Sequence, residues 1–302
     1  MPHDAAVDET HPAYLGFLDC FIRGASLQDI YTSSEQGFGV RTRRLEDDQA
    51  HRRKLAAQCR VQFDRIFGHM RNLAEPIDRQ VGLQGRKVLD FGAGTGALTV
   101  AVALRGATVT AVDPTAVSLD ACRWRARYFG LPDERVPTRV IGAEPGLPFP
   151  DATFDLVTCN SVFEFIPDRR EAYVRELARV LRPGGHLVIS TENGLYPVDY
   201  YTRRWFPLLR RKAMRRLNVP YGLTWFELGR WLRNTGRRVV DLSKANAFNS
   251  MDHFVARRRE RGGGVVVEAA AAGNAVLKAA CRTVGLPSQI FFPYTTFIFE
   301  LH

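Results

Sequence analysis

The chain has 302 residues, of which 45% are hydrophobic and 25% charged, and its formal net charge is +10. That length suits one α/β domain with a cap or insertions, and the composition is ordinary for a globular enzyme. Because no run of about 18 apolar residues occurs, we expect no membrane-spanning helix. The positive charge attracts anions, which leaves phosphorylated small molecules, carboxylates, anionic lipid surfaces and nucleic acid as candidate partners.

The five cysteines are scattered along the chain and never stand in C-x-x-C spacing. This pattern is typical of reduced thiols with structural roles, and it predicts no zinc site. The amino-terminal stretch is polar and acidic, unlike a signal peptide. We therefore expect a cytoplasmic protein.

Residues 1–80 are predicted to be helical. Within them, Leu55–Leu73 carries apolar residues at helical spacing, so one face of this helix must pack against another element. We interpret residues 1–80 as an N-terminal helical lid or cap, with a structural brace as the alternative, and residues 81–302 as the main domain.

From residue 87 onwards, short apolar segments alternate with amphipathic ones. The predicted strands are Lys87–Phe91, Thr108–Val112, Thr138–Ile141, Phe154–Cys159 and His186–Thr191. The predicted helices between them are Ala97–Arg105, a helix that ends near Phe129, and Asp168–Leu181. Alternation of this kind predicts a parallel sheet with helices on both faces.

The tail departs from this alternation. Thr224 and Glu227 form a capping box for a helix that runs to about Asn234. Two late strands, Val239–Leu242 and Thr295–Leu301, are separated by a long insert that contains a helix near Val266–Thr283. Because no ordinary crossover joins these strands, we expect an antiparallel edge on the sheet. The RRRERGGG segment at 257–264 is interpreted as a turn.

A glycine-rich loop follows the first predicted strand, in the order Asp90-Phe91-Gly92-Ala93-Gly94-Thr95-Gly96. Glycines let the backbone turn tightly and approach a ligand, while the first amides of the next helix point at it. Asp113 ends the second strand, where a carboxylate can accept two hydrogen bonds from a ribose diol. Taken alone, this pattern suits a dinucleotide such as NAD equally well.

Four ordered segments extend the pattern: VLDFGAGTG at 88–96, AVDP at 111–114, LPFPDATFDLV at 147–157 and VLRPGGHLVIS at 180–190. In this order and spacing, the chain resembles the ubiquinone-biosynthesis-type (methyltransferase type 11) branch of class I S-adenosylmethionine-dependent methyltransferases over roughly residues 85–245. The resemblance implies a Rossmann-like, doubly wound seven-stranded sheet, mostly parallel with an antiparallel last strand. The helical insertions on it fall at about 193–222 and 245–290.

The resemblance also implies a set of residues that bind S-adenosylmethionine. In this family the glycine loop approaches the methionine part of the cofactor, and the acid after the second strand binds the ribose. Carried over to this chain, the cofactor-binding residues are Asp90, Gly92, Ala93, Gly94, Gly96, Asp113, Pro114, Ala143, Glu144 and Asn160. Ala143 and Glu144 match the segment beside the adenine, and Asn160 matches the position facing the methionine moiety and the acceptor. The chain departs from the family at Gly142, where an aspartate commonly binds the adenine amino group.

Methyl transfer is an in-line displacement that depends mainly on positioning the acceptor. A general base matters for a hydroxyl or carbon acceptor, and the candidates are His253, Glu164, His51 and Tyr200. Glu192-Asn193 resembles the Asp-Asn pair of metal-dependent catechol-type enzymes. Cys159-Asn160 stands where those enzymes carry a partner aspartate, so we expect no catalytic metal.

The segment after the fifth predicted strand combines tyrosines with arginines. Its candidate acceptor-binding residues are Tyr196, Tyr200, Tyr201, Arg203 and Arg204. They suit an anionic acceptor or a peripheral contact with a membrane or lipid-linked acceptor, and the alternative is an amphipathic helix with a solvated basic face. Nucleic acid is disfavoured, since the Asn-Pro-Pro-Tyr signature is absent at 160–163 and no RNA-binding module is present.

We therefore predict S-adenosylmethionine-dependent methyl transfer to a small-molecule acceptor in biosynthesis, with oxygen favoured over carbon or nitrogen. The acceptor is expected to be phosphorylated, carboxylated or lipid-linked. Two alternatives stay open at this point: an NAD-dependent oxidoreductase, and a protein of the same fold that does not methylate.

Overall fold

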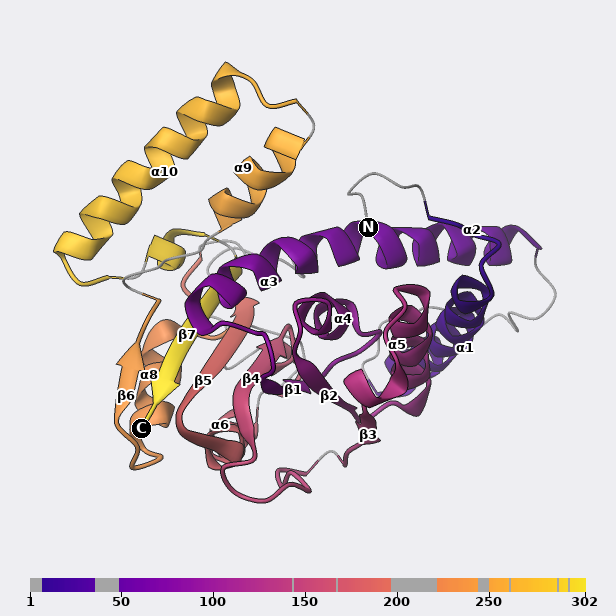
Figure 1. Cartoon of the computed structure of the whole chain (residues 1–302), viewed down its shortest axis with the longest axis horizontal. Coiled ribbons are helices and arrows are strands. Elements are labelled where there is room, and N and C mark those ends of the chain that lie inside the picture. Colours follow the sequence, from indigo (N-terminus) through magenta and orange to yellow (C-terminus); the bar gives the residue numbers. More distant parts are fainter. Residues whose placement is uncertain are drawn as a thin grey trace.

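The computed structural model describes residues 7–35, 49–142, 144–166, 168–196, 222–243, 250–260, 262–286, 288–292 and 294–302. Its centre is a seven-stranded sheet in the order β3-β2-β1-β4-β5-β7-β6 (Figure 1). The strands are β1 (Lys87–Phe91), β2 (Thr108–Asp113), β3 (Thr138–Val140), β4 (Phe154–Asn160), β5 (Leu181–Glu192), β6 (Val239–Asp241) and β7 (Tyr294–Leu301). This confirms the predicted doubly wound sheet.

The first five strands pair in parallel, whereas β7 runs antiparallel to both of its neighbours, β5 and β6. The predicted antiparallel strand is therefore confirmed. In β1 and β4 nearly every residue is buried, as expected for parallel strands that helices cover on both faces. Because β7 is reversed, its first residue lies beside the end of β5, with Tyr294 paired to Glu192.

Helices cover both faces of the sheet, and further helices lie outside these two layers. The helices are α1 (Pro12–Glu35), α2 (Gln49–Arg60), α3 (Phe67–Val81), α4 (Ala97–Ala103), α5 (Ala116–Tyr128), α6 (Arg170–Val180), α8 (Trp225–Arg233), α9 (Ser250–Glu260) and α10 (Val265–Thr283). One layer buries apolar residues of α3, α4 and α5, and the other those of α6 and α8. A π-helical segment, η2 (Val61–Ile66), joins α2 to α3, and short 3-10 turns are η3 (Asp133–Arg135), η4 (Phe163–Phe165) and η5 (Ser288–Phe291).

The N-terminal segment packs on α5 at one end of the molecule (Figure 1). Its inner face buries Tyr14 and Phe17 of α1 together with Phe63 of η2, against Val117 and Ala121 of α5. The helical character predicted for residues 1–80 is confirmed for the described part. The predicted apolar face is confirmed as well, since Leu55, Cys59, Phe63, Phe67 and Leu73 are all buried.

Three predictions about local structure were wrong. The helix predicted from Asp168 begins at Arg170, after Arg169 has taken a non-helical ψ of 12°. The strand predicted from His186 begins at Leu181, because Leu181 already pairs with Phe154 across an irregularity before His186 pairs with Leu156. The segment 257–264, predicted as a turn, is helical up to Glu260.

The insert at 245–290 holds a second helix that the sequence did not predict. Residues up to Glu260 belong to α9, which packs beside α10 (Figure 1). Arg259 forms a bidentate ion pair with Glu268 of α10, and Lys278 of α10 binds Asp252 of α9 at 2.6 and 2.7 Å. These two ion pairs join α9 to α10, and one of them uses Arg259 of the arginine-rich stretch.

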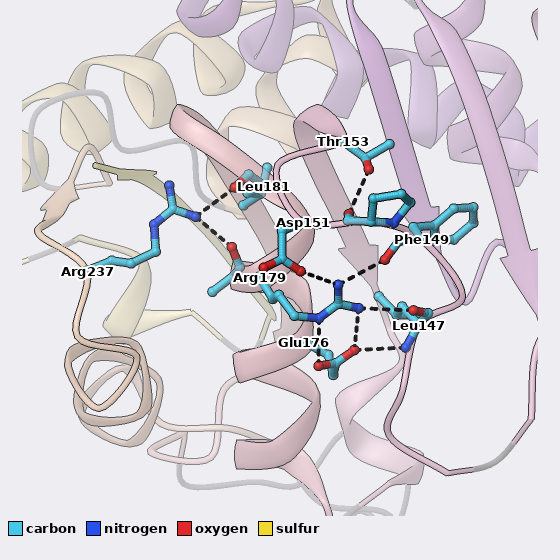
Figure 2. Close-up of polar contacts among 10 residues, drawn as sticks. Leu147, Phe149, Asp151, Thr153, Glu176, Arg179, Leu181 and Arg237 are labelled. Carbon is cyan, nitrogen blue, oxygen red and sulfur yellow. Dashed lines mark hydrogen bonds and ion pairs between the residues drawn. The ribbon is translucent and has the colours of Figure 1, made fainter.

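Two arginines bind backbone carbonyls at the amino edge of the sheet, where the central strands begin. Arg179 at the end of α6 contacts the carboxylates of Glu176 and Asp151 and the carbonyls of Leu147 and Phe149 (Figure 2). Arg237 donates to four carbonyls, those of Ala178, Leu181, Arg182 and Leu301. These bonds satisfy backbone groups at the amino edge and leave the carboxyl edge for function.

None of the helices in the described part of the chain is both long and apolar enough to cross a bilayer. The five cysteines are buried and free of disulfide bonds.

Candidate functional site

The glycine loop between β1 and α4 turns through three glycines with positive φ: Gly92 at 73°, Gly94 at 51° and Gly96 at 77°. A Cβ at Gly92 would lie 2.2 Å from a methyl carbon of Val162, and one at Gly96 would lie 2.3 Å from the sulfur of Cys122. A Cβ at Gly94 would meet no atom within 4 Å in the described residues. Gly92 and Gly96 are therefore required by packing inside the protein, whereas Gly94 borders open space.

Asp113 closes this loop from the end of β2. One carboxylate oxygen accepts the amide N–H of Gly94 at 3.0 Å, and the other accepts that of Thr115 at 2.9 Å. Burial raises the pKa of Asp113, and these two backbone N–H groups oppose that rise. The side chain is still 9% exposed, so the carboxylate both holds the loop and reaches its surface. Pro114, which follows it, is exposed.

Asp90 lies beneath the loop. It is 2% exposed, and it accepts hydrogen bonds from the hydroxyls of Thr99 at 2.5 Å and Thr158 at 2.8 Å. Burial raises the pKa of Asp90. Both carboxylate oxygens thus bind protein groups of α4 and β4, so this acid positions the loop between its two neighbours.

A hydroxyl cluster lies where β4 ends. The phenol of Tyr294, the first residue of β7, is 2.5 Å from the hydroxyl of Ser161 and donates to the amide oxygen of Asn160 at 3.2 Å. Since a phenol has one proton, the Ser161 hydroxyl must be the donor to Tyr294. Ser161 also has a φ of 55°, a strained value for a residue with a side chain.

The sequence pointed to Asn160 and missed both Ser161 and Tyr294. The strained backbone of Ser161 leaves no mark in residue type. Tyr294 could have been found only by pairing the last strand with β5 in register, since the two residues are 133 positions apart.

The predicted adenine side is only partly described. Glu144 forms an ion pair with Arg169, and its side chain is 77% exposed. This pairing raises the pKa of Arg169. Ala143 lies outside the described residues. Within the described part, the adenine side thus consists of an exposed ion pair, and the predicted adenine contacts stay a prediction.

Glu164, in the turn after β4, is fully buried. One of its oxygens accepts the Thr191 hydroxyl at 3.0 Å and the Glu192 amide at 2.8 Å. The other oxygen, Oε2, has no hydrogen-bond partner among the described residues. Burial raises the pKa of Glu164. Of the four candidate bases, this is the one whose side chain is described; the side chains of His51 and His253, and Tyr200, lie outside the described residues.

Of the five predicted acceptor-binding residues, the structure describes one. Tyr196 is described, with its amide bonded to the carbonyl of Asn193 at 3.0 Å. Tyr200, Tyr201, Arg203 and Arg204 lie outside the described residues. The segment that carries them leaves the sheet at the carboxyl end of β5, since β5 ends at Glu192.

A groove of about 540 Å³ lies elsewhere, between α8 and the edge strand β6. Its lining residues are Trp225, Phe226, Gly229, Arg233, Arg238, Val239, Val240, Asp241 and Phe299. Three strands separate β6 from β1 in the sheet. Because ligands of open α/β sheets bind at the carboxyl ends of the central strands, this groove is not the candidate site.

Three adjacent strand ends therefore bring the predicted residues together at the carboxyl edge of the sheet. In the order β2-β1-β4, they contribute Asp113, the glycine loop and Asn160. The open space at Gly94, the partly exposed carboxylate and the amide suit a ligand that carries a sugar diol and an amino-acid moiety. The residues present thus fit S-adenosylmethionine, with the adenine side still to be tested.

Comparison with known proteins agrees with this fit to S-adenosylmethionine. A family model described as "Methyltransferase domain" matches residues 89–189. The ubiquinone biosynthesis O-methyltransferase of Pseudomonas fluorescens is 35% identical over 173 residues, which cover 55% of this chain and 70% of that protein. The Pseudomonas aeruginosa enzyme of the same name matches over the same shares at 35% identity.

Among solved structures, an S-adenosylmethionine-dependent methyltransferase from Mesorhizobium loti aligns with a TM-score of 0.48 at 20% identity, covering 75% of this chain and 97% of that one. The sequence matches, which cover more than two thirds of their relatives, decide against the NAD-dependent alternative. The chain belongs to the S-adenosylmethionine-dependent methyltransferases, in the branch of the ubiquinone-biosynthesis enzymes.

Proposed function

We propose that this enzyme methylates a hydroxyl group of a small-molecule acceptor. The observation that carries the proposal is the 35% identity to relatives named O-methyltransferases, over 70% of their length. The hydroxyl cluster at the end of β4 is compatible with it, because the oxygens of Ser161 and Tyr294 can accept a hydrogen bond from an acceptor hydroxyl.

We further propose how the cofactor is held. Asp113 would accept hydrogen bonds from the ribose diol, and the backbone at Gly94 would lie against the methionine part, where the space is open. Asn160 would face the same moiety, with Ala143 and Glu144 beside the adenine. The bound cofactor supplies a methyl group on a sulfonium centre, which transfers by direct displacement.

The chain's own residues then have two tasks on the acceptor side. They must hold the acceptor oxygen in line with the methyl group, at about 3–3.5 Å, and exclude water. They must also take up the hydroxyl proton, a contribution of roughly 10²–10⁴-fold in rate. Tyr294 and Ser161 would orient the hydroxyl, and Glu164 lies in the turn that follows Ser161.

The acceptor class is proposed from charge and composition. The tyrosines and arginines of residues 193–222 would form the acceptor wall, and the net charge of +10 favours an acceptor with phosphate or carboxylate, or a lipid-linked one. The N-terminal residues 1–80 would cover the site as a lid. Insertions this long in an α/β unit commonly serve function.

The test is a product assay with matched acceptors. Purified enzyme and S-adenosylmethionine are incubated with three small aromatics that differ in one group: a catechol, the corresponding aniline and the corresponding thiol, each with and without a carboxylate. Mass spectrometry should find one added CH₂ on the catechol, more on the carboxylated form. Methylation of the aniline alone would overturn oxygen as the acceptor atom. Consumption of no acceptor, with S-adenosylhomocysteine still bound, would favour a non-methylating role.

A further inference from the structure

Arg125 of α5 is fully buried and has no carboxylate partner among the described residues. It donates instead to three backbone carbonyls: from Nε to Thr95 at 3.0 Å, from Nη1 to Phe63 at 3.2 Å and from Nη2 to Gln62 at 3.2 Å. Burying an unpaired charge is costly. A buried charge that is retained despite this cost indicates that its contacts are important for the fold or for the site.

The three carbonyls belong to two distant parts of the chain. Thr95 lies in the glycine loop, between Gly94 and Gly96. Gln62 and Phe63 lie in η2, the π-helical turn of the N-terminal segment. In an α-helix each carbonyl accepts a hydrogen bond from the N–H of the residue four positions later. In a π-turn the donor is five positions later, and such turns often occur at functional sites. In η2 the guanidinium of Arg125 is a partner for two of these carbonyls.

The rest of the guanidinium is enclosed by the N-terminal segment. Its carbon lies 4.7 Å from the ring centre of Phe17 in α1, 5.1 Å from that of Phe63 in η2 and 5.8 Å from that of Phe67 in α3. Such rings stabilise a desolvated cation. Burial lowers the pKa of Arg125 to about 10, so the side chain remains charged at neutral pH.

We propose that Arg125 is a positioning residue of the cofactor site, which makes cofactor affinity depend on the docking of α1 and η2. The carbonyl of Thr95 belongs to the peptide between Thr95 and Gly96 in the glycine loop, and Arg125 fixes that carbonyl only while η2 and the three rings hold the guanidinium. The N-terminal segment is then part of the cofactor site as well as a cover. This inference rests on the proposed placement of the cofactor at the glycine loop.

Linkage makes the coupling reciprocal. If docking of the N-terminal segment tightens cofactor binding, bound cofactor must stabilise that docking by the same factor. S-adenosylhomocysteine should therefore slow amide hydrogen exchange at residues 61–67, although the proposed cofactor contacts do not include them.

The first experiment compares two arginines. Arg125→Met keeps an unbranched stem and removes the charge. The control is Arg105→Met: Arg105 ties α3 to α4 by donating to the carbonyls of Arg71 and Ala101 at 3.0 and 2.9 Å, and within the described residues it makes no hydrogen bond to the glycine loop. Calorimetry with S-adenosylhomocysteine should give at least tenfold weaker binding for Arg125→Met. Arg105→Met should lower the Tm while its Kd stays within twofold of wild type.

Equal Kd values for the two variants at matched folded fractions would overturn the proposal. Should Arg125→Met fail to fold, Arg125→Lys and the wild-type exchange experiment decide. Lysine keeps the charge but cannot bond the loop and η2 in a fixed fork, so binding should still weaken. Protection by S-adenosylhomocysteine at 87–129 without any at 61–67 would also overturn the coupling. Failure of the wild-type protein to bind the compound would instead count against the proposed cofactor site.

Discussion

At the scale of single residues, the glycine loop shows that one motif can contain glycines of different purpose. Gly92 and Gly96 make room for Val162 and Cys122 within the protein, while Gly94 leaves space that the protein does not fill. The same residue type in the same loop thus serves packing at two positions and, as we propose, the ligand at the third.

Gly94 can be tested against a glycine of equal strain. Gly130 also has a positive φ, 71°, and open space around a Cβ. Alanine at either site should cost about 1–2 kcal/mol from the left-handed backbone. Gly94→Ala should also weaken S-adenosylhomocysteine binding, and Gly94→Val should abolish it, whereas Gly130→Ala should bind normally. Normal calorimetric affinity in Gly94→Val would mean that the loop is only a turn.

Asp113→Ala should weaken cofactor binding by one to two orders of magnitude or more. Each charge-assisted hydrogen bond to the ribose contributes roughly 1.5–3 kcal/mol, and every 1.4 kcal/mol is about tenfold in Kd. The control is Asp120→Ala, which removes an exposed acid paired with Arg123 on α5. Calorimetry on both folded variants is the measurement, and an unchanged Kd in Asp113→Ala would remove the central contact of the proposed site.

Tyr294→Phe should lower kcat about tenfold and weaken cofactor binding by a smaller factor. The phenol both receives the Ser161 hydroxyl and fixes the amide of Asn160, so its loss releases two groups beside the acceptor. Tyr128→Phe is the control: the phenol of Tyr128, in α5, accepts a hydrogen bond from the amide N–H of Asp8 and is not part of the hydroxyl cluster. Steady-state kinetics with the acceptor found by the product assay decide the matter. A lower Tm with wild-type kcat would indicate a structural role alone.

At the scale of elements, the segments added to the sheet differ in how they are attached. The N-terminal helices pack through a continuous apolar face on α5, whereas α9 and α10 are cross-linked mainly to each other by ion pairs and extend from the body of the molecule (Figure 1). The segment between β5 and α8 begins at the carboxyl edge, beside the end of β4 that carries Asn160. It is therefore where we expect acceptor specificity.

Variants of that segment should alter acceptor kinetics and leave the affinity for S-adenosylmethionine unchanged. Arg203→Ala and Arg204→Ala should raise the acceptor KM several-fold, more at low salt, because exposed charges are screened within about 10 Å at 0.1 M. Tyr200→Phe and Tyr201→Phe test whether a phenol orients the acceptor, and at least one should lower kcat. Wild-type acceptor kinetics in all four variants would place the acceptor pocket under the 245–290 insert instead.

At the scale of the whole molecule, buried acids make stability depend on pH. Burial raises the pKa of Glu164 and of Asp90, so the folded state binds their protons more tightly than the unfolded state does. Their stabilising contribution is complete below the unfolded values, about 4.3 and 3.9, and is lost as pH rises through the raised folded values. Neutral and alkaline pH therefore weaken the fold through these groups.

Glu164→Gln should reduce that dependence. Glutamine can keep the two hydrogen bonds from Thr191 and Glu192 but cannot ionise, so the fall in Tm from pH 5 to pH 8 should be smaller than in the wild type. Glu75→Gln, at an exposed ion pair with Arg79, is the control and should follow the wild-type profile. Parallel profiles for wild type and Glu164→Gln in thermal melts would show that this carboxyl does not drive the effect.

Much of the fold follows from the sequence because its signals are local. The strand Lys87–Phe91 was predicted residue for residue, and the capping box of Thr224 and Glu227 is present as expected. Periodicity and caps act over a few residues, so they survive without tertiary context. The same holds for the glycine loop and Asp113, which end neighbouring strands and so meet at one edge.

Tertiary structure alone decided which polar groups are buried and what they bind. Arg125 meets carbonyls 30 and 62 residues away, and Tyr294 meets Ser161 across 133. Glu164 is an ordinary glutamate in the sequence, yet burial raises its pKa. Such properties depend on strand register and on how helices cover the sheet. The sequence by itself therefore determined the family, the sheet and the glycine loop, while the support of that loop by Arg125 and the hydroxyl cluster of Ser161 and Tyr294 came only from packing between distant segments.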